Sequence, residues 1–509
     1  MKLCTASQMR EFDRLIIEAG TPGTVLMERA GQHCADGVVK MLGEVAGRRI
    51  LIVCGGGNNG GDGFVVARLL QSLQAKVQVV LLVSADGLQG DAKVNFARLD
   101  GIEPIVLLCE DDVASFDLHG DLVVDCLFGT GLSRPVTGRF GLMIQRINGS
   151  GRPVVAVVIP SGLDADTGQV LGQAVRADLT VTFQLQKLGL VQFPALDYVG
   201  EVLVVDIGLS KKYIEDAALA SLLDHDRAVR LLPDRIQTGH KGSFGHVLVV
   251  AGSRGKTGAA ILSSLGCLRA GAGLVSLCVP EKLNVIVEST LLEAMTIPVR
   301  GLDGLCFHNH DFVQILDAAS GKGCVVVGPG LGQEPSTAQL LNQLLVNLTT
   351  PLVVDADGLN LLHEDSLESL AGRRVVLTPH PGEMALLTGK TVAEIQQDRV
   401  KVARGFAKQF EVVVVLKGAA TVIAGPSGEV AINSSGNAGM ATGGMGDVLS
   451  GIIATLLAQG MSAFAAACLG VYSHGRAGDL LNHDGAPYGY LASELADTLP
   501  DVWQELLAG

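Results

Sequence analysis

The chain has 509 residues, a formal net charge of −14, 65 glycines and 48% hydrophobic residues. This length exceeds what one hydrophobic core usually serves, so more than one domain is expected. The acidic balance argues against general nucleic-acid binding, which needs a basic surface, but nucleotides stay possible because backbone amides can hold phosphates. The ten cysteines are scattered without a C-x-x-C pair, which indicates a reducing compartment and no structural zinc.

The first half of the chain predicts alternating strands and helices. Apolar residues at helical spacing over 5–45 precede a buried strand at 50–54, a glycine-rich loop at 55–63 and a helix at 64–73. A helix is expected at 90–99, and further strands at 77–83, 104–108, 121–126, 153–159, 179–184 and 202–207. Such alternation at short spacing predicts an α/β fold with a doubly wound, mostly parallel sheet covered on both faces.

The charged segment 210–245 lacks strand character, so the domain boundary is placed near residue 222, between domains 1–222 and 223–509. In the second domain a helix is expected at 257–270, and the part from Gly446 onward is expected to be helical. Strands are expected at 246–251, 273–279, 323–327, 351–355, 374–378, 412–416 and 421–424.

Neither the apolar run near residue 460 nor the first residues predict a membrane protein. The apolar run Gly451–Val471 contains Thr455, Gln459 and Gly460, which predicts two buried helices broken near Gln459 rather than a membrane span. The first residues have no apolar core of the kind a signal peptide needs, so a cytoplasmic protein is expected.

The loop 55–63, reading GGGNNGGDG, carries the first chemical signal. Strand, glycine loop and helix form the unit in which phosphates bind at a helix N-terminus. A plain G-x-G-x-x-G would be weak evidence. Here Asn58 and Asn59 add amide donors and acceptors, and Asp62 can take a ribose hydroxyl or a cation, which a purely structural turn does not require.

Other polar residues are predicted at the same edge of the sheet. Asp125 ends an apolar strand, and the loop 129–135 after it offers backbone donors and one Arg. The loop after the next strand brings Ser161, Asp164 and Asp166. Carboxylate, amide and hydroxyl oxygens that converge there suit a hard or monovalent cation.

Lys187 stands within apolar residues, in the stretch FQLQKLGL. A lysine in such surroundings can be an acid or base with a shifted pKa. The alternative is a surface lysine whose ammonium reaches water, and the residues alone do not decide between the two.

The second half contains a misleading resemblance to a phosphate-binding P-loop. Gly255, Lys256 and Thr257 follow a strand, but the P-loop spacing requires Gly at the position of Val250. We therefore reject a P-loop, although this strand–turn–helix and the later GPGLG turn at 328–332 still offer backbone amides to a phosphate.

Two further stretches follow strands. His380 stands between two prolines that fix its position, although a histidine in a turn is often merely exposed. Lys417 and Gly418 end a strand, and their charge and backbone amide can meet an adenine nucleotide.

The stretch 437–451, reading NAGMATGGMGDVLSG, surrounds Asp447 with glycines and leads into an apolar helix. Glycines let backbone N–H groups turn toward one point, and the helix N-terminus adds its positive dipole end. A carboxylate beside bound phosphate would be repelled, so we interpret Asp447 as the base that takes a proton from an attacking hydroxyl. The alternative is a glycine-rich turn capped by Asp.

Taken together, these motifs resemble those of bifunctional NAD(P)H-hydrate repair enzymes. The resemblance covers essentially the whole chain and rests on NNGGDG, GTGLSRP, IPSGLDADTG and FQLQKLGL in the first half, and on HKGSFG, GPGLG, DADGLN, TPHPGEM, KGAAT and GMATGGMGDVLSG in the second. It implies a Rossmann-like NAD(P)H-hydrate epimerase domain followed by a ribokinase-like, ADP-dependent NAD(P)H-hydrate dehydratase domain. Such enzymes interconvert the R and S hydrates of NADH and NADPH, and restore the S form while ADP becomes AMP and phosphate.

For the first domain, the resemblance implies a hydrate-binding set and a potassium site. The implied hydrate-binding residues are Asn58, Asn59, Gly60, Gly61, Asp62, Gly129, Thr130, Gly131, Leu132, Ser133, Arg134, Pro135 and position 158. Asn59, Asp125 and Ser161 are the implied potassium ligands. Lys187 is our candidate for catalysis.

For the second domain, the resemblance implies that the hydrate contacts Ala259, either Gly330 or Gly332, His380 and the catalytic Asp447. The nucleotide is expected on Lys417, Gly418, Ala419, Ala420, Thr421 and Gly446. Magnesium is expected with the nucleotide, although the sequence reveals no carboxylate cage for it. A homo-oligomer is also expected.

The chain departs from the family pattern at Val158, where an Asp is expected before the I-P-S-G motif. That Asp would contact the hydrate and is a candidate acid or base. One alternative is therefore a dehydratase whose first domain only binds nucleotides or mediates assembly. A second alternative, from the second domain, is a ribokinase-like small-molecule kinase.

Overall fold

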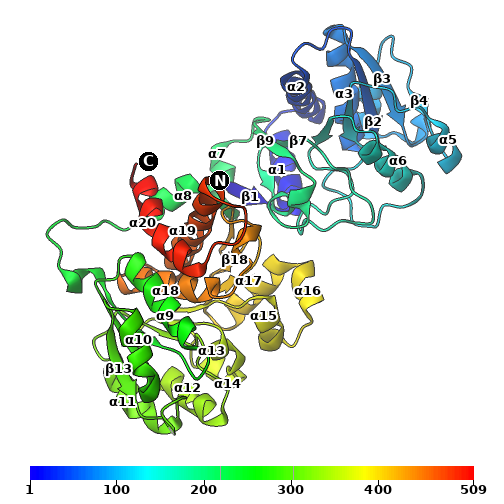
Figure 1. Cartoon of the computed structure of the whole chain (residues 1–509). Coiled ribbons are helices and arrows are strands. Elements are labelled where there is room, and N and C mark those ends of the chain that lie inside the picture. The colour runs from blue at the N-terminus through cyan, green and yellow to red at the C-terminus, as the bar shows by residue number, and fades with distance from the viewer. Residues whose placement is uncertain (218, 302, 509) are drawn as a thin grey trace. The chain divides into compact units, whose positions relative to one another are not determined.

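The computed structural model describes residues 1–217, 219–301 and 303–508. These fall into two compact units, one comprising Lys2–Ala220 and the other Met1 together with the residues from Ser221 onward (Figure 1). Each unit is built on a mostly parallel sheet with helices packed against it, so the predicted α/β fold class is confirmed.

The first unit contains a seven-stranded sheet in the order β4-β3-β2-β5-β6-β7-β9, in which every neighbouring pair is parallel. A separate parallel pair joins β1 to β8 and sets Cys4 opposite Lys187. The strands are β1 (Lys2–Cys4), β2 (Arg49–Cys54), β3 (Lys76–Leu81), β4 (Ile105–Val106), β5 (Leu122–Cys126), β6 (Val154–Val157), β7 (Leu179–Phe183), β8 (Gln186–Lys187) and β9 (Glu201–Val205).

Helices cover both faces of this sheet because its buried strands are apolar on both sides. Ile50 and Ile52 of β2 pack in the core formed with α2 and α3, whereas Leu51 and Val53 pack in the core formed with α5 and α6. The helices are α1 (Ala6–Glu18), α2 (Gly23–Leu42), α3 (Asn58–Ser72), α4 (Gly90–Phe96), α5 (Glu110–Ser115), α6 (Gly138–Gly149) and α7 (Lys211–Asp216).

In the second unit the strands follow the order β13-β12-β11-β14-β15-β16-β17-β18-β19-β10. Pairing is parallel except where β18 runs antiparallel to β17 and to β19. The strands are β10 (Ala220–Leu223), β11 (His246–Val250), β12 (Leu274–Pro280), β13 (Met295–Val299), β14 (Cys324–Val327), β15 (Leu352–Val354), β16 (Val375–Leu377), β17 (Val413–Leu416), β18 (Val422–Ala424) and β19 (Val430–Asn433).

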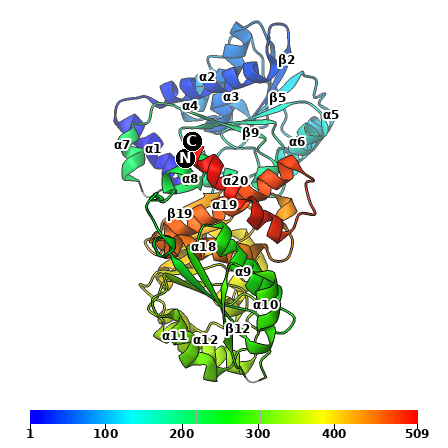
Figure 2. The ribbon, with the colours of Figure 1, turned by 60° about the vertical axis from the view of Figure 1, so that its left-hand side comes forward.

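One face of this sheet is covered by α9, α18, α19 and α20, which pack together in one apolar core (Figure 2). The helices of the second unit are α8 (His225–Leu231), α9 (Thr257–Arg269), α10 (Asn284–Thr290), α11 (Phe312–Ala319), α12 (Pro335–Asn347), α13 (Asp357–Asn360), α14 (Glu364–Glu368), α15 (Pro381–Thr388), α16 (Val392–Gln397), α17 (Arg399–Gln409), α18 (Met445–Ala458), α19 (Ala463–Asp484) and α20 (Ala492–Ala508).

Some sequence predictions of local structure were wrong. The loop predicted through residue 63 is helical from Asn58, because Gly60, Gly61 and Gly63 pack so tightly that a Cβ at any of them would meet another atom within 3.0 Å. Segment 210–245 contains strand β10, which was not predicted, and β1, β8, β13 and β19 were also missed. These five strands have two to five residues each, too few to establish a period-2 pattern.

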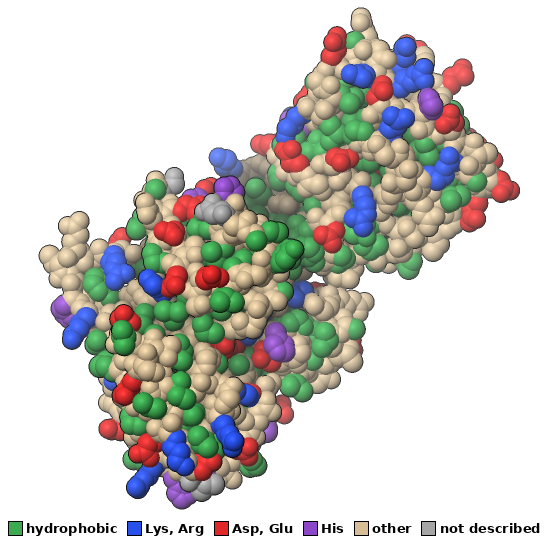
Figure 3. Space-filling model, viewed as in Figure 1, with side chains coloured by type: hydrophobic (Ala, Val, Ile, Leu, Met, Phe, Trp, Pro, Cys, Tyr) green, Lys and Arg blue, Asp and Glu red, His purple; other side chains and the backbone are tan. Residues whose placement is uncertain are grey.

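The apolar run at 451–471 is divided between α18 and α19, as predicted from the break near Gln459. Among the described helices, none combines the length and the apolar character needed to cross a bilayer. Acidic and basic side chains are scattered among each other over the visible face of each unit (Figure 3). All ten cysteines are free thiols, and Cys54, Cys126, Cys278 and Cys324 are buried, as expected for cysteines within apolar strands.

Val158, which follows β6, has a φ of +71°. This left-handed region is a conformational outlier for a β-branched residue. The Val158 N–H donates to the carbonyl of Val181 at 2.8 Å, so the sheet holds the backbone in this conformation. The position itself therefore favours Asn, Asp or Gly over the valine that occupies it.

We predict that Val158→Asn raises the free energy of unfolding by about 1 kcal/mol, because Asn tolerates the left-handed region. Urea unfolding followed by circular dichroism measures the change. Trp503, the sole tryptophan, lies in the second unit. Its fluorescence follows unfolding of that unit and is an internal reference, because Val158 lies in the first unit. The matched control is Val157→Asn in the buried strand β6, which should destabilise the protein. Equal losses in both variants would contradict strain at Val158.

Candidate active sites

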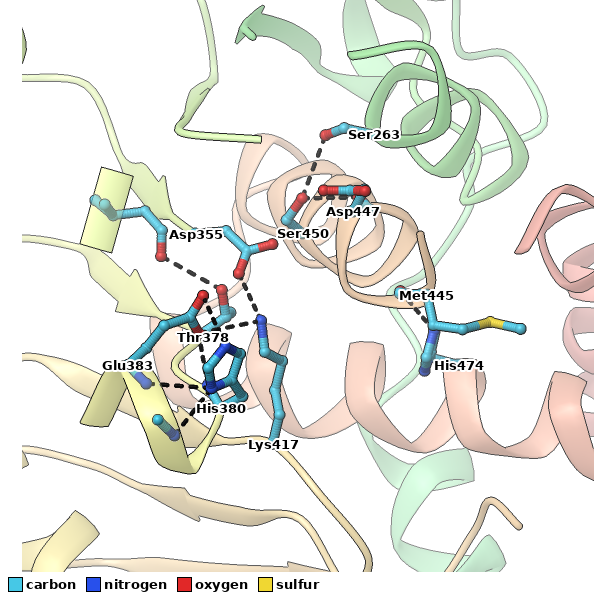
Figure 4. Close-up of polar contacts among 12 residues, drawn as sticks. Ser263, Asp355, Thr378, His380, Glu383, Lys417, Met445, Asp447, Ser450 and His474 are labelled. Carbon is cyan, nitrogen blue, oxygen red and sulfur yellow. Dashed lines mark hydrogen bonds and ion pairs between the residues drawn. The ribbon is translucent and has the colours of Figure 1, made fainter. Parts of the chain in front are cut away.

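Three adjacent strands of the second unit, β15, β16 and β17, bring charged residues to one edge of the sheet (Figure 4). Asp355 directly follows β15, and Lys417 directly follows β17. His380 and Glu383 lie at the start of α15, the helix that follows β16. The carboxyl edge of a parallel sheet is where α/β folds place ligands, so this cluster is a candidate site.

Lys417 is held between two carboxylates. Its Nζ lies 2.7 Å from Asp355 Oδ1 and 3.7 Å from Glu383 Oε2, and its side chain is 18% exposed. Burial lowers the pKa of Lys417, but the charges of Asp355 and Glu383 outweigh it and raise the pKa overall. Lys417 is therefore held as a cation within this cluster.

Asp447 lies in the first turn of α18, where Gly444 precedes the helix with a φ of +91°. Burial, followed by the charge of Asp355, raises the pKa of Asp447 to about 7. The Ser450 hydroxyl donates to the Asp447 carbonyl at 2.8 Å, and His474 Nε2 lies 2.9 Å from the Met445 carbonyl (Figure 4). These contacts fix the helix start, so the carboxylate is positioned and poised to exchange a proton near neutrality.

Gly446 lies between these charges. A Cβ at Gly446 would be 3.3 Å from Lys417 Nζ and 3.9 Å from Asp355 Oδ2. Asp355 Oδ2 is buried and has no hydrogen-bond partner. The structure therefore brings together Asp447, Gly446 and Lys417, which the sequence had placed in one site, and adds Asp355.

The loop from Lys417 to Thr421 is exposed or half-buried and has two unusual backbone conformations, at Gly418 and Ala420 (φ of +134° and +51°). Thr421 Oγ1 donates to the Gly418 carbonyl at 2.8 Å. Beneath the loop, the buried Arg399 donates through Nη2 to the carbonyls of Leu416 and Lys417, at 2.9 and 3.3 Å. Arg399 therefore supports the predicted nucleotide loop, a role that the sequence did not reveal.

Ala259 and the GPGLG turn form a neighbouring group. A Cβ at Gly330 would lie 3.1 Å from the Ala259 Cβ, so the turn packs closely on the start of α9. The Gly332 N–H donates to Asp357 Oδ2 at 3.0 Å, and Lys256 Nζ lies 2.8 Å from the same oxygen. Both glycines proposed from the sequence therefore lie in one ordered turn, and the contacts do not select between them.

His380 caps helix α15. Its Nδ1 accepts hydrogen bonds from the backbone N–H groups of Gly382 and Glu383, at 2.9 and 3.1 Å. Its Nε2 lies 3.5 Å from Glu383 Oε1, and the side chain is 57% exposed. The ring is thus fixed by the helix and open to a ligand (Figure 4).

The first unit contains a cavity of about 670 Å³. Its lining brings together most of the residues predicted there: Asn58, Asn59, Asp62, Gly129, Thr130, Gly131, Leu132, Ser133, Arg134, Val158 and Lys187. Gly60, Gly61 and Pro135 are not among the lining residues. Gly60 and Gly61 are buried in α3, and their role in the structure is close packing.

Asp125 and Ser161 meet beside this cavity. The Ser161 hydroxyl donates to Asp125 Oδ1 at 2.6 Å, and the Ser161 N–H donates to Oδ2 at 2.7 Å. Burial raises the pKa of Asp125 to about 6, although the bonds from Ser161 oppose the rise. Both side-chain polar atoms of Asn59 are buried without a partner, and Gly129 packs against this side chain. A buried amide without a partner is costly, so these atoms are candidates for ligand contact.

Lys187 is fully buried, so the surface-lysine interpretation is wrong. Its Nζ donates to the carbonyls of Phe183 and Leu185 at 2.8 and 3.0 Å. Burial lowers its pKa.

Sequence reasoning missed three carboxylates: Asp13 of α1, which lines the cavity, and Asp355 and Glu383 beside Lys417. Asp355 could have been found because it ends an apolar strand, like Asp125. Asp13 offered no such signal, since a polar residue on an amphipathic helix usually faces water.

The fold and these two clusters indicate an α/β enzyme in which each unit carries a candidate site. The family model described as NAD(P)H-hydrate dehydratase matches residues 247–501, and the model described as YjeF-related protein N-terminus matches residues 23–189. The bifunctional NAD(P)H-hydrate repair enzyme Nnr of Moorella thermoacetica is 43% identical over 99% of this chain and 97% of its own length. The Escherichia coli enzyme of the same name is 36% identical over 89% of this chain and 85% of its own.

Among solved structures, the ADP/ATP-dependent NAD(P)H-hydrate dehydratase from Bacillus subtilis, co-crystallised with ATP and Mg²⁺, is 33% identical with a TM-score of 0.48. The match covers 56% of this chain and 99% of the Bacillus subtilis chain. The near full-length similarity to the curated relatives decides the assignment: the chain belongs to the family of bifunctional NAD(P)H-hydrate repair enzymes.

We predict that the pKa of Asp447 responds in opposite directions to its two neighbours. Asp355→Asn removes a negative charge and should lower this pKa below about 7, whereas Lys417→Met removes a positive charge and should raise it. Carboxyl ¹³C NMR titration, with the signal assigned by its loss in Asp447→Asn, measures both shifts. The exposed Asp501→Asn should leave the titration unchanged. The same pKa in all three variants would refute this electrostatic coupling.

Proposed function

We propose that this chain repairs NADH and NADPH that have taken up water across a ring double bond. The second unit dehydrates the S hydrate with ADP as phosphoryl donor, and the first unit interconverts the R and S hydrates. The names of the relatives, at up to 43% identity over nearly the whole chain, support this activity. We assign the two activities to residues 1–222 and 223–509.

The observation that carries the proposal is Asp447, a half-buried carboxyl with a pKa of about 7 at the N-terminus of a glycine-preceded helix. Near neutral pH, a group with this pKa can accept a proton and release it again. The helix N-terminus and the glycine amides around it suit the negative charge of a phosphoryl group.

Hydroxide is a poor leaving group, and phosphate is a good one. Asp447 accepts the proton of the hydrate hydroxyl while the hydroxyl oxygen attacks the β-phosphorus of ADP. The bond between that phosphorus and the bridging oxygen of AMP then breaks. The phosphate on the hydrate then leaves with the C–O electron pair, a proton leaves the adjacent carbon, and the ring double bond is restored. Lys417 and the amide of Gly446 face the charge that develops on the transferring group.

The nucleotide and the hydrate would both lie beside Asp447. The nucleotide occupies Lys417, Gly418, Ala419, Ala420, Thr421 and Gly446, and the hydrate contacts Ala259, the turn with Gly330 and Gly332, His380 and Asp447. The Lys417 ammonium and the exposed 417–421 backbone support this nucleotide assignment. The exposed ring of His380 supports contact with the hydrate.

Magnesium would come with the nucleotide. Among the described residues, no group of three or more His, Cys, Asp or Glu is arranged to hold a metal ion. Asp355 offers one buried oxygen without a partner, which fits an ion held mainly by phosphates and water. When bound, magnesium neutralises phosphate charge during transfer.

A potassium ion fits the first unit. Asn59 Oδ1 is buried without a partner, and the Asp125 carboxylate and Ser161 hydroxyl lie together beside the cavity. These three residues would hold the ion, whose charge would stabilise the buried Asp125 carboxylate. The cavity lined by Asn58, Asp62 and the 129–134 loop would take the hydrate.

We further propose that the enzyme works in the cytoplasm, which the ten free thiols support. The homo-oligomer expected from the sequence stays a prediction. The dehydratase-only alternative is favoured by one observation: Val158 places an apolar side chain in the cavity wall, where the family pattern has a carboxylate.

We predict that Asp447→Asn lowers S-hydrate dehydration by about 10²–10⁴-fold, the usual contribution of a general base, with nucleotide affinity unchanged. The assay follows the return of reduced-nicotinamide absorbance with NADH hydrate, ADP, Mg²⁺ and K⁺, and calorimetry measures ADP binding. Asp501→Asn is the control. Full activity in Asp447→Asn would refute the role of this residue. Accumulation of a phosphorylated alcohol with ATP, without dehydration, would favour the kinase alternative.

We predict that Val158→Asp changes the rate of R-to-S conversion by less than tenfold, because other groups in the cavity supply the proton transfer. Chromatographic separation of the two hydrates measures this rate, and spontaneous conversion in buffer is subtracted. A steep increase from a silent wild type would instead support the alternative, in which the first unit only binds its ligand because Val158 replaced a catalytic carboxylate.

A further inference from the structure

The first-unit cavity holds titratable groups that the potassium site does not use. Asp13 of α1, Asp62 of α3 and Lys187 of β8 all line it. The position where the family pattern has a carboxylate carries Val158, which has no proton to give or take. Any proton transfer in this cavity must therefore come from other side chains.

The chain builds this corner from its first residues. Thr5 and Gln8 form a capping box that starts α1 directly after β1, and β1 pairs with β8 so that Cys4 is opposite Lys187. Along α1, Met9, Asp13 and Ile17 recur at a spacing of four, and all three line the cavity. Asp13 is thus the polar member of an otherwise apolar helix stripe.

The ammonium of Lys187 is bound by backbone carbonyls and has no carboxylate as a counter-ion among the described residues. Its Nζ donates to two backbone carbonyls, at 2.8 and 3.0 Å, and among the described residues no carboxylate lies within ion-pair distance of it. Burial lowers its pKa, opposed by the charges of Cys4 and Asp13. A buried ammonium without a paired carboxylate is ready to give up a proton.

Asp13 is a carboxyl that can accept a proton. Burial raises the pKa of Asp13 to about 6, and the charge of Lys187 opposes the rise. Cys4 and Asp62 also act on this pair, and the pKa of each is raised mainly by burial. The cavity wall further contains the charged residues Arg10, Asp91 and Arg134. Near neutral pH, Asp13 can thus act as a base while Lys187 acts as an acid.

Resting on the epimerase half of the proposed function, we propose that Asp13 and Lys187 are the base and the acid that move protons during interconversion of the hydrates. The proposal rests on their joint place in the cavity wall, on the unpaired burial of Lys187 and on the apolar side chain at 158.

Opening and closing of the nicotinamide ring can invert the hydrated carbon without any net gain or loss of protons or electrons. The hydrated carbon bears both the hydroxyl and the ring nitrogen. Asp13 takes the hydroxyl proton, the C–N bond breaks with its electron pair going to nitrogen, and Lys187 protonates that nitrogen, which leaves an aldehyde. Rotation presents the other face of the aldehyde. Lys187 takes its proton back as nitrogen attacks, Asp13 returns its proton to oxygen, and the carbon is inverted.

The test uses the full chain and R hydrate of NADH without ADP, so that dehydration is silent, and separates R and S hydrates by chromatography. Asp13→Asn and Lys187→Met should each lower the catalysed conversion by about 100-fold or more. Lys187→Arg should fail too, since Arg keeps the charge but holds its proton. The matched control is Glu11→Gln, an exposed carboxylate on the same helix that pairs with Arg14, which should change the rate less than twofold.

The pH profile distinguishes proton transfer from support of the fold. The wild-type rate should rise with pH through about 6, as Asp13 ionises, and fall at higher pH as Lys187 loses its proton. Asp13→Asn should remove the lower limb of the residual rate, and Lys187→Met the upper limb. Dehydration of S hydrate with ADP, measured on the same samples, should be unchanged in every variant.

The outcomes separate the two claims. A wild type that converts R to S, with Asp13→Asn and Lys187→Met unimpaired, overturns the acid–base pair and leaves the epimerase function standing. A loss in Asp13→Asn that leaves the lower limb in place also overturns it. A wild type no faster than buffer overturns the epimerase function and the pair with it, while dehydration of S hydrate still tests the second unit.

Discussion

The ion pair between Lys417 and Asp355 organises the second unit's site. It joins the ends of β17 and β15 across β16, and Glu383 completes the surroundings of the ammonium from the helix after β16. Taking two charges out of water is costly, so such a pair is weak evidence for stability alone. Its effect reaches Asp447: the charge of Asp355 helps to raise the pKa of Asp447, whereas that of Lys417 lowers it. The pair thus influences the proton affinity of Asp447, the proposed base, as well as the charge at the proposed phosphate site.

The first unit uses buried charge differently. Its cavity contains Lys187 and carboxylates that do not approach one another closely enough to form ion pairs among the described residues. Groups that are desolvated but unpaired shift toward their neutral forms: burial raises the pKa of Asp13 to about 6 and lowers that of Lys187. The second unit therefore arranges fixed charges around one carboxyl that can exchange a proton, Asp447, whereas the first unit keeps several unpaired groups that can do so. This difference agrees with phosphoryl transfer in the second unit and ring opening in the first.

Much of both sites could be predicted from sequence because buried strands are apolar runs, and the first polar residue after such a run must emerge at the sheet edge. Asp125 and Lys417 were placed in this way. The start of α3 was misplaced because glycines predict a loop, whereas Gly60 is helical and packs against the carbonyl of Gly55, where no side chain fits. Asp13 and Glu383 were missed because each lies on a helix where an acid has an ordinary explanation, a solvent-facing position or a capping box.

The cap that His380 makes on α15 also determines which proton its ring carries. Nδ1 accepts two backbone hydrogen bonds, so in the neutral ring the hydrogen must be on Nε2. The exposed edge of the imidazole therefore offers a donor and no lone pair. His380 can recognise an oxygen of a bound substrate, such as a hydroxyl or a carboxamide carbonyl, but it cannot remove a proton from it. The helix cap thus fixes a single tautomer, which reserves the role of base at this site for Asp447.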